Sequence, residues 1–490
     1  MHVLLLIICV LLSGCQHPDD KAIRFGLAAA PVNLDPRYAT DAASERINRL
    51  VYARLTDHDA QARPAASLAS WKRLDPRHYR FTLGAQAREF HDGQRLVADD
   101  VAATYRSILD PAGRSPHRAA LSMVERIEVR DPDTLDFYLN RPDALFPGYL
   151  TIGILPAGAI ADGQNFERRP MGSGAFRLLD WKEGGSLTLE RRADGQRVVF
   201  EPVKDPTMRV LKLLRGEIDL LQSDLPPELL GYLERQPGIH VQRRPGSNFA
   251  YLGFQLQDAD TGRPLVRRAI ALAIDRDAII DYIFHGAARP AAALLPPEHW
   301  AGATQLAPIT PDPQQARQLL RQAGYTPDRP LQLTYKTSSD PFRVRIASVI
   351  QQQLAAVGID ARIRSYDWGT FYGDIKAGRF QLYSLAWVGI KSPDIFRYAF
   401  HSDSVPPAGA NRGRLSDPVV DRLIGQAGQA DSLETQARIY RELQQRLLAQ
   451  LPYVPLWYEH QYVATGPRID GYTLAADGAY DALVTTQRVQ

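Results

Sequence analysis

Cysteine is almost absent from this sequence of 490 residues, which contains Cys9 and Cys15 and no other. Both lie near the start, so a mature body beginning at Cys15 would hold no disulfide and no cysteine-ligated metal. Such a protein depends on its hydrophobic core, and a chain of 490 residues with 45% hydrophobic content can build several domain cores. The formal charge of +3 is spread along the chain, which favours neither nucleic acid nor an anionic membrane surface as a partner.

Recognisable catalytic motifs are also absent. The sequence has no GxSxG nucleophile elbow, no HExxH zinc motif and no Walker-type phosphate loop, and residues 172–174 are too short for a dinucleotide fingerprint. A turn-rich segment separates His78 from His91, which is not the spacing of metal ligands on a helix. Asp99 and Asp100 point to different faces of a helix and are expected to cap it. We therefore predict no enzymatic activity, no catalytic residue, no cofactor and no metal site.

The N-terminus has the pattern of a lipoprotein signal. The apolar run Val3 to Leu11 is followed by Leu12-Ser13-Gly14-Cys15, and small residues before a cysteine suit cleavage there and lipidation of the thiol. The run is about half the ~20 residues needed to span a bilayer. An ordinary signal peptide or a short membrane helix is the alternative, since His2 is the only potential positive charge before the run. We expect a signal peptide over residues 1–14 and a lipidated tether over 15–21.

The body of the chain alternates strand and helix patterns. Residues Leu331 to Tyr335, Pro341 to Val357 and Asp360 to Tyr366 read as strand, helix and strand, which predicts a unit of an α/β domain. The same reasoning predicts strands at Ala22–Leu27 and Tyr79–Leu83, helices at Ala42–Leu55, from Ala98, and at Ser432–Leu448, and a hairpin joining Ile127–Val129 to Thr134–Phe137.

Three blocks of sequence carry a family resemblance. The first runs from Leu68 to Val101 and includes Phe90-His91-Asp92-Gly93, the second is Pro170 to Leu178, and the third runs from Leu265 to Arg276. In order and spacing they resemble the large extracytoplasmic solute-binding proteins of ABC importers, the family of peptide, nickel and related binders. The resemblance covers essentially the whole mature chain.

This resemblance implies an α/β fold of the bilobed periplasmic-binding-protein type, with an additional small domain and two lobes joined by hinge strands. Lobe I is then discontinuous, with parts at residues 22–47, 167–248 and 469–490. The small domain occupies 48–166 and lobe II occupies 249–468.

The resemblance also implies a function. We expect a monomeric, lipid-anchored component of an ABC import system that lies on the extracytoplasmic face of the cell envelope, in a periplasm where there is one. Its partners would be a peptide or peptide-like ligand, captured by domain closure, and the ABC permease and ATPase complex. One alternative is the same fold binding a metal chelate, an opine-like compound or a sugar. Another is a secreted hydrolase or a lipoprotein chaperone.

The segment Trp387 to Phe396 departs from the pattern of peptide binders in this family. Those proteins hold the ligand's ammonium group with an aspartate, and the matching position here is Gly389. A buried ammonium without a counter-charge is unfavourable. Either Asp394 takes over this role or the ligand has no free amino terminus at the usual place. Asp394 also has a purely structural interpretation as the acid at the start of a helix.

Further ligand-binding residues are expected around this segment. Arg412 would pair with a ligand carboxylate or would hold its own loop to the domain. Backbone pairing with a peptide is implied for Ala30-Pro31-Val32 and Trp387-Val388-Gly389. The apolar walls of the pocket would come from four aromatic side chains, namely Tyr251, Trp368, Tyr383 and Trp387.

The lipid anchor can be tested at one position. Changing Cys15→Ala removes the acceptor thiol, so the protein should lose palmitate label and move from the membrane fraction to the soluble fraction, because an acyl chain contributes about 0.8 kcal/mol per buried methylene to membrane binding. Cys9→Ala is the matched control and should keep both the label and the membrane association. Palmitate labelling that persists in the Cys15→Ala protein would contradict the assignment.

Overall fold

The computed structural model describes residues 21–85 and 88–489. The Cys15 signal and the cleavage site therefore lie outside the described residues. A mixed sheet of 11 strands crosses the molecule in the order β15-β14-β16-β12-β17-β11-β1-β10-β9-β8, and β13 pairs with β17 beside this path. Its strands are β1 (Ile23–Leu27), β8 (Phe176–Trp181), β9 (Leu187–Arg191), β10 (Arg197–Pro202), β11 (Leu220–Gln222), β12 (His240–Phe254), β13 (Ala288–Pro290), β14 (Leu331–Ser338), β15 (Ile359–Tyr366), β16 (Leu382–Trp387) and β17 (Tyr453–Thr465).

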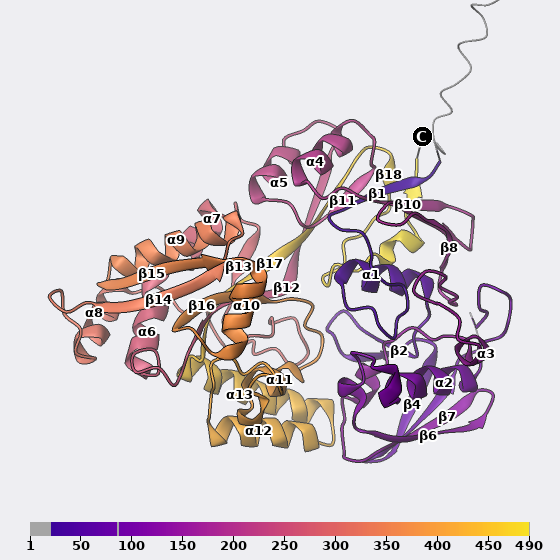
Figure 1. Cartoon of the computed structure of the whole chain (residues 1–490), viewed down its shortest axis with the longest axis horizontal. Helices are drawn as coiled ribbons and strands as arrows, with labels where there is room; N and C mark the ends of the chain where they lie inside the picture. The colour runs from indigo at the N-terminus through magenta and orange to yellow at the C-terminus, as the bar shows by residue number, and fades with distance from the viewer. Residues whose placement is uncertain (1–20, 86–87, 490) are drawn as a thin grey trace, which may run out of the picture.

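Two long antiparallel strands connect the two halves of this sheet (Figure 1). At one end of the pair, His240 to Arg244 of β12 face Thr465 to Gln461 of β17; at the other end, Asn248 to Gly253 face Glu459 to Tyr453. We call the strands β11, β1, β10, β9 and β8 the β1 half, which joins β17 at its first end. We call β16, β14 and β15, with the helices packed on them, the β16 half, which joins β12 at its other end.

The register of the two connecting strands shifts between Arg244 and Asn248. The intervening residues 245–247 are therefore a bulge, which bends the strand and increases its local twist. A Cβ added to Gly246 would lie 2.4 Å from the backbone oxygen of Glu459, so no side chain fits there without moving backbone. Glycine at this position lets the two strands pass closely at the point where the halves meet.

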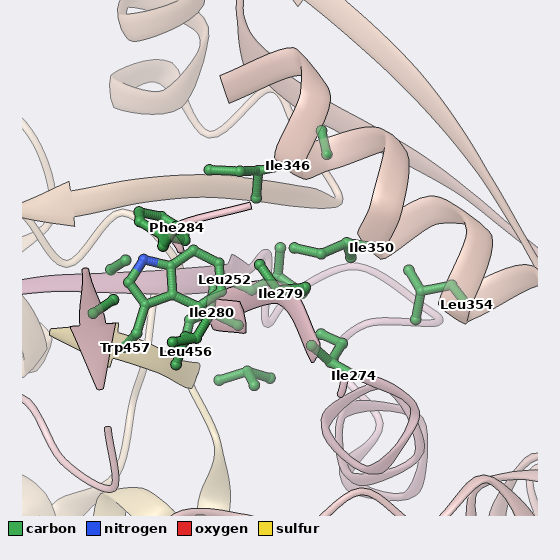
Figure 2. Close-up of a cluster of buried hydrophobic side chains, with 14 of the residues drawn as sticks. Leu252, Ile274, Ile279, Ile280, Phe284, Ile346, Ile350, Leu354, Leu456 and Trp457 are labelled. Atoms are coloured by element: carbon green, nitrogen blue, oxygen red, sulfur yellow. The ribbon is translucent and has the colours of Figure 1, made fainter. Parts of the chain in front are cut away.

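The largest hydrophobic core extends from the β16 half across the connecting strands to α4 and α5. Figure 2 shows part of it, where Leu252, Leu456 and Trp457 of the connecting strands meet side chains of α7 and α9. A second core lies between the sheet and α11 to α13 and includes Phe396, Leu423 and Leu443. The helices are α1 (Ala42–Val51), α2 (Ala98–Leu109), α3 (Ala157–Ala161), α4 (Pro206–Leu214), α5 (Pro227–Leu233), α6 (Pro264–Ala273), α7 (Arg276–Tyr282), α8 (Pro313–Gln322), α9 (Pro341–Ala355), α10 (Trp368–Ala377), α11 (Ile395–Phe400), α12 (Pro418–Gln429) and α13 (Leu433–Gln450).

A separate antiparallel sheet lies beside both halves, in the purple part of Figure 1, with strand order β4-β5-β7-β6. We call this sheet, α2, which packs on it, and the other described residues from 53 to 166 the four-stranded region. Its core is a third cluster, which includes Phe81, Val101 and Phe137. The remaining strands are β2 (Thr56–His58), β3 (Pro64–Ala66), β4 (Ala69–Asp75), β5 (His78–Leu83), β6 (Val124–Asp131), β7 (Thr134–Leu139), β18 (Ile469–Asp470) and β19 (Gln487–Arg488).

The predicted strand-helix-strand unit is confirmed, because β14 and β15 pair in parallel on either side of α9. The predicted hairpin is confirmed as the antiparallel pair β6 and β7. The first predicted helix was too long, since α1 ends at Val51 rather than at Leu55. Tyr52 takes an extended backbone and its hydroxyl donates to the carbonyl of Leu34 at 3.0 Å, so the chain leaves the helix there to enter the four-stranded region.

A substitution at Gly246 tests the close approach of the two strands at the bulge. Gly246→Ala should lower the free energy of unfolding by about 1–3 kcal/mol, because the added methyl group meets the backbone of Glu459. Guanidinium denaturation measures the change. Gly425→Ala in α12 is the matched control, since a Cβ there meets nothing within 4 Å and alanine favours the helix. Equal stability of the Gly246→Ala protein and the wild type would contradict the close approach of the two strands.

Candidate functional site

A cavity of about 340 Å³ lies where the β1 half, the four-stranded region and the loop after β16 meet. Helix α1 contributes Asn48 and Arg49, the chain entering the four-stranded region contributes Arg54 and His58, and the loop contributes Lys391. The wall combines these polar groups with apolar surface. The other lining residues are Pro36, Ala39, Glu45, His117, Ala120, Leu121, Gly148, Tyr149, Thr151, Ile152, Gly153, Gly389 and Ser392.

Ion pairs fix the cationic side chains of this cavity. Arg49 donates to both carboxylate oxygens of Asp57, each at 3.2 Å, and to Asp481 near the C-terminus at 2.5 and 3.2 Å. Arg54 donates to the same Asp57 at 2.7 Å. The two guanidinium groups therefore share one carboxylate, and Arg49 ties α1 to two segments that are distant in the sequence.

Lys391 holds the loop after β16 against the C-terminal segment. Its Nζ lies 2.9 Å from a carboxylate oxygen of Asp477. Burial alone would raise the pKa of Asp477, but the charge of Lys391 and its hydrogen bond lower it to about 2. The carbonyl of Lys391 also lies 3.0 Å from Nε2 of His299. The loop after β16 is thus joined to the C-terminal segment and to the loop that carries His299.

Two further contacts join the β16 half to the four-stranded region. The amide of Trp300 donates to the carbonyl of Gln61 at 3.0 Å, and Arg73 donates to the carbonyl of Asp431 at 2.9 Å. These contacts and the Lys391 pair join segments that the connecting strands alone would not hold together.

His58 is neutral at physiological pH. Burial lowers its pKa most, the positive charge of Lys391 adds to this, and the resulting pKa is about 4. A neutral imidazole both donates and accepts hydrogen bonds, so His58 contributes polarity to the cavity without charge.

Gly389 forms part of the cavity wall, and its positive φ of 70° suits glycine. Asp394, by contrast, is not among the described residues that line the cavity. It precedes α11 as the N-cap residue and makes no capping hydrogen bond through its side chain. Burial raises the pKa of Asp394, and burial together with the charge of Asp394 raises the pKa of Asp143 in the four-stranded region to about 6. The ammonium role predicted for Asp394 stays a prediction.

Arg412 is enclosed by aromatic side chains. It is 6% exposed, donates to the hydroxyl groups of Tyr251 at 2.8 Å and Tyr372 at 3.3 Å, and lies 4.7 Å from the ring centroid of Trp387. These contacts tie its loop to β12 and α10, and the pairing of Arg412 with a ligand carboxylate stays a prediction. Trp387 and Tyr251 stack at 6.4 Å, and Tyr383 meets Tyr251 edge-on at 5.8 Å.

The other predicted ligand residues lie apart from this aromatic group or at its margin. Trp368 is 59% exposed and stacks on Tyr372 at 5.3 Å. Val388 and Val32 are both exposed, at 66% and 64%, and Pro31 is buried beside the half-buried Ala30. The amide of Val32 already donates to Oγ of Ser44 at 2.8 Å, so it is not free to pair with a ligand backbone.

Sequence reasoning missed the polar and charged residues of the cavity. Asn48, Arg49, Arg54 and His58 belong to no motif, because they meet the loop after β16 only in the folded chain. Lys391 offered a usable signal, since it follows Gly389 by two residues and places a positive charge where peptide binders of this family have a negative one nearby.

Two other kinds of feature are absent from the described part of the chain. Within residues 21–85 and 88–489, no group of three or more histidine, cysteine or acidic side chains is arranged to hold a metal ion. None of the helices in these ranges is both long enough and apolar enough to cross a membrane.

The fold is that of a bilobed solute-binding protein. Residues 61–406 match the family described as bacterial extracellular solute-binding proteins, family 5 Middle. The chain belongs to this family, as the sequence predicted. The family consists of extracellular proteins that bind solutes, which places the chain in the same class.

Two curated relatives align along nearly the full length. The chain is 26% identical to di/tripeptide-binding protein 2 of Pseudomonas aeruginosa (strain UCBPP-PA14), and the alignment covers 97% of each protein. It is 27% identical to heme-binding protein A of Haemophilus influenzae, with 93% of this chain and 90% of the relative covered. Relatives of similar identity thus carry names for different ligands.

Solved structures confirm the predicted bilobed α/β fold. The substrate-binding protein CtaP of Listeria monocytogenes superposes with a TM-score of 0.86 at 22% identity, covering 96% of this chain and 99% of that one. DppA of Helicobacter pylori, solved with the peptide STSA, gives a TM-score of 0.78 at 25% identity, covering 96% and 98%.

The effect of the Lys391 charge on the pKa of His58 can be measured. Lys391→Met removes the nearby positive charge, so the pKa of His58 should rise from about 4 toward 6.5, as followed by an NMR titration of the histidine ring. His91 is the internal control: burial also lowers its pKa to about 4, and Arg192 and Arg177, not Lys391, are the cations acting on it. A His58 pKa unchanged in the variant would contradict the placement of Lys391 beside it.

Proposed function

We propose that this protein is the lipid-anchored solute-binding component of an ABC import system, which captures peptides or peptide-like solutes by domain closure and delivers them to a membrane permease. In this proposal lobe I comprises residues 22–47, 167–248 and 469–490, the small domain 48–166 and lobe II 249–468. The lipid on Cys15 keeps the protein close to its permease, and the protein acts as a monomer.

The observation that carries this proposal is the cavity between the parts. Its wall is built from both sides of the connecting strands β12 and β17, so opening at the bulge would expose it and closing would enclose a solute. The Lys391–Asp477 pair spans the same gap and would form or break with that motion. A binding protein that exchanges its solute with a permease requires such an arrangement.

Strand β16 supports a peptide or peptide-like ligand. β12 pairs with the whole of β16, up to Phe249 with Trp387, but the described pairing of β14 with β16 stops at Lys336 with Tyr383. The far edge of residues 384–387 is therefore open, and an extended peptide can add to such an edge through its backbone. The relative named for di- and tripeptides points the same way.

Gly389 favours the second candidate, a non-peptide solute bound by the same fold. Without an acid at this position, no negative charge there favours a peptide with a free amino terminus over a metal chelate, an opine-like compound or a sugar. The relative named for heme shows that similar sequences carry names for other ligands. The hydrolase alternative has no supporting observation, since the family is one of solute-binding proteins.

A thermal-shift screen of the soluble form that starts at Gln16 tests the peptide assignment. Di- to pentapeptides should stabilise the protein, by about 2.7 kcal/mol at 100 times the dissociation constant. If Asp394 anchors the ammonium group, N-acetylated peptides should stabilise less and Asp394→Ala should lose the difference. Asp403→Ala, at a side chain that is 82% exposed, is the matched control. A screen in which no peptide stabilises the protein would contradict the assignment.

A further inference from the structure

Two polar links connect the halves of the molecule beside the bulge. Arg345 of α9 donates to a carboxylate oxygen of Glu228 of α5 at 2.5 Å. Arg243 of β12 donates through Nε to Glu234, the residue after α5, at 2.7 Å, and through Nη1 to the carbonyl of His285, after α7, at 3.2 Å. Helix α5 follows β11 of the β1 half, whereas α7 and α9 pack together in the β16 half (Figure 2). We call these contacts the α5 links.

The first turn of α9 is also fixed to the strand opposite the bulge. Arg343 donates to the carboxylate of Glu459 at 2.9 Å. Glu459 pairs with Asn248 at the edge of the bulge, and its backbone oxygen faces Gly246. Helix α9 therefore moves with the β16 half, and a bend at the bulge changes the distance between α9 and α5.

The α5 links and the cavity lie on opposite sides of the connecting strands. At one end of β17, Tyr462 packs in the same cluster as α5, whereas the next residue, Val463, packs with α1. At the other end, Leu252 of β12 packs with α7 and α9, whereas Tyr251 stacks on Trp387 at the end of β16. Successive residues of a strand point to opposite faces. Figure 1 shows the same arrangement, with α5, α7 and α9 on one side of the strands and α1 and α11 on the other.

This placement gives the contacts on the two sides opposite effects on a bend at the bulge. A bend that brings the cavity walls together moves α7 and α9 away from α5, because these helices lie on the other side of the strands. Such a bend breaks the α5 links, whereas a bend in the opposite sense breaks the pair of Lys391 with Asp477. An attractive contact resists only the separation of its partners. The α5 links therefore resist closure, and the Lys391–Asp477 pair resists opening.

We propose that the α5 links oppose closure of the cavity, so that Arg243, Arg345 and Glu228 limit solute affinity from the side of the hinge that a solute does not touch. The inference rests on the proposed capture of solutes by domain closure and adds the residues that regulate it. When the binding-competent state is only partly populated, the apparent affinity is lowered by that fraction. The three residues are positioning residues, because they act through the hinge.

The strength of the α5 links suits a regulatory role. Arg345 and Glu228 are 42% and 47% exposed, and an ion pair at such a site shifts an equilibrium by about threefold. Arg243 is 24% exposed and has two partners, so its effect should be at least as large. Links of this strength bias the position of the hinge without preventing closure.

Distances measured in the protein without solute test the proposal. The soluble form that starts at Gln16 contains no cysteine, so Ala42→Cys in α1 and Gln426→Cys in α12 provide two exposed sites for nitroxide labels. Double electron–electron resonance then reports how far apart the two sides of the cavity lie. In the Arg345→Gln protein the shorter distances should gain population by about threefold over the wild type, and in the Arg243→Gln, Arg345→Gln double variant by more.

Two comparisons locate the effect. Arg177→Gln breaks an ion pair of the same length, 2.5 Å, with Glu190, but both residues lie in the β1 half and the distances should stay unchanged. Exchanging the charges in a Glu228→Arg, Arg345→Glu double variant restores the pair and should restore the wild-type distances. Circular dichroism checks folding. If the Arg243→Gln protein is unfolded, Arg345→Gln and the charge exchange decide the question alone.

The affinity of the variants gives an independent readout. Any peptide that binds should bind the Arg345→Gln protein more tightly, by up to about threefold, since closure no longer breaks that link. A variant that is merely damaged would bind more weakly. Unchanged or longer distances in the variants would overturn the inference and leave peptide binding intact. A shift to shorter distances in a protein that binds no peptide would support the inference and contradict the peptide assignment.

Discussion

The structure depends on the antiparallel pairing of β12 with β17. These two strands carry the sheet from one half of the molecule to the other, and the bulge at residues 245–247 changes their register where the halves meet. A pair of strands held by backbone hydrogen bonds resists sliding but bends at a bulge, so it can guide the two halves toward and away from each other. Hydrophobic clusters pack against this pair of strands, and the largest of them includes side chains of β12, β17 and the helices α4 to α9.

Buried charges have two different uses in this chain. Arg412 lies among tyrosine and tryptophan side chains and is satisfied by hydroxyl groups and aromatic faces, so it fastens a loop. Arg54 lines the cavity and pairs with Asp57, which it shares with Arg49. The distinction depends on what surrounds each guanidinium, since the residue type is the same. Neutral hydroxyl groups and aromatic faces hold the first guanidinium, and a carboxylate holds the second.

Local patterns predicted much of the fold. The strand-helix-strand unit around α9 and the hairpin of β6 and β7 follow from periodicity and turn residues, because these depend on neighbours within a few positions. The end of α1 did not follow, since Tyr52 leaves the helix to reach the carbonyl of Leu34. The predicted aromatic ligand wall mixes residues of one buried group, Tyr251, Tyr383 and Trp387, with the exposed Trp368 at its margin.

The sequence by itself determined the class of protein, because the motif blocks keep their order and spacing along the chain, and it pointed to Gly389 as the position where this chain differs from peptide binders. Only the tertiary structure decided which charges meet at the cavity. Arg49 and Asp481 are 432 residues apart, and Lys391 reaches Asp477 only because the loop after β16 meets the C-terminal segment. Contacts between such distant residues arise from the packing of separate elements, which leaves no periodic signal in the sequence.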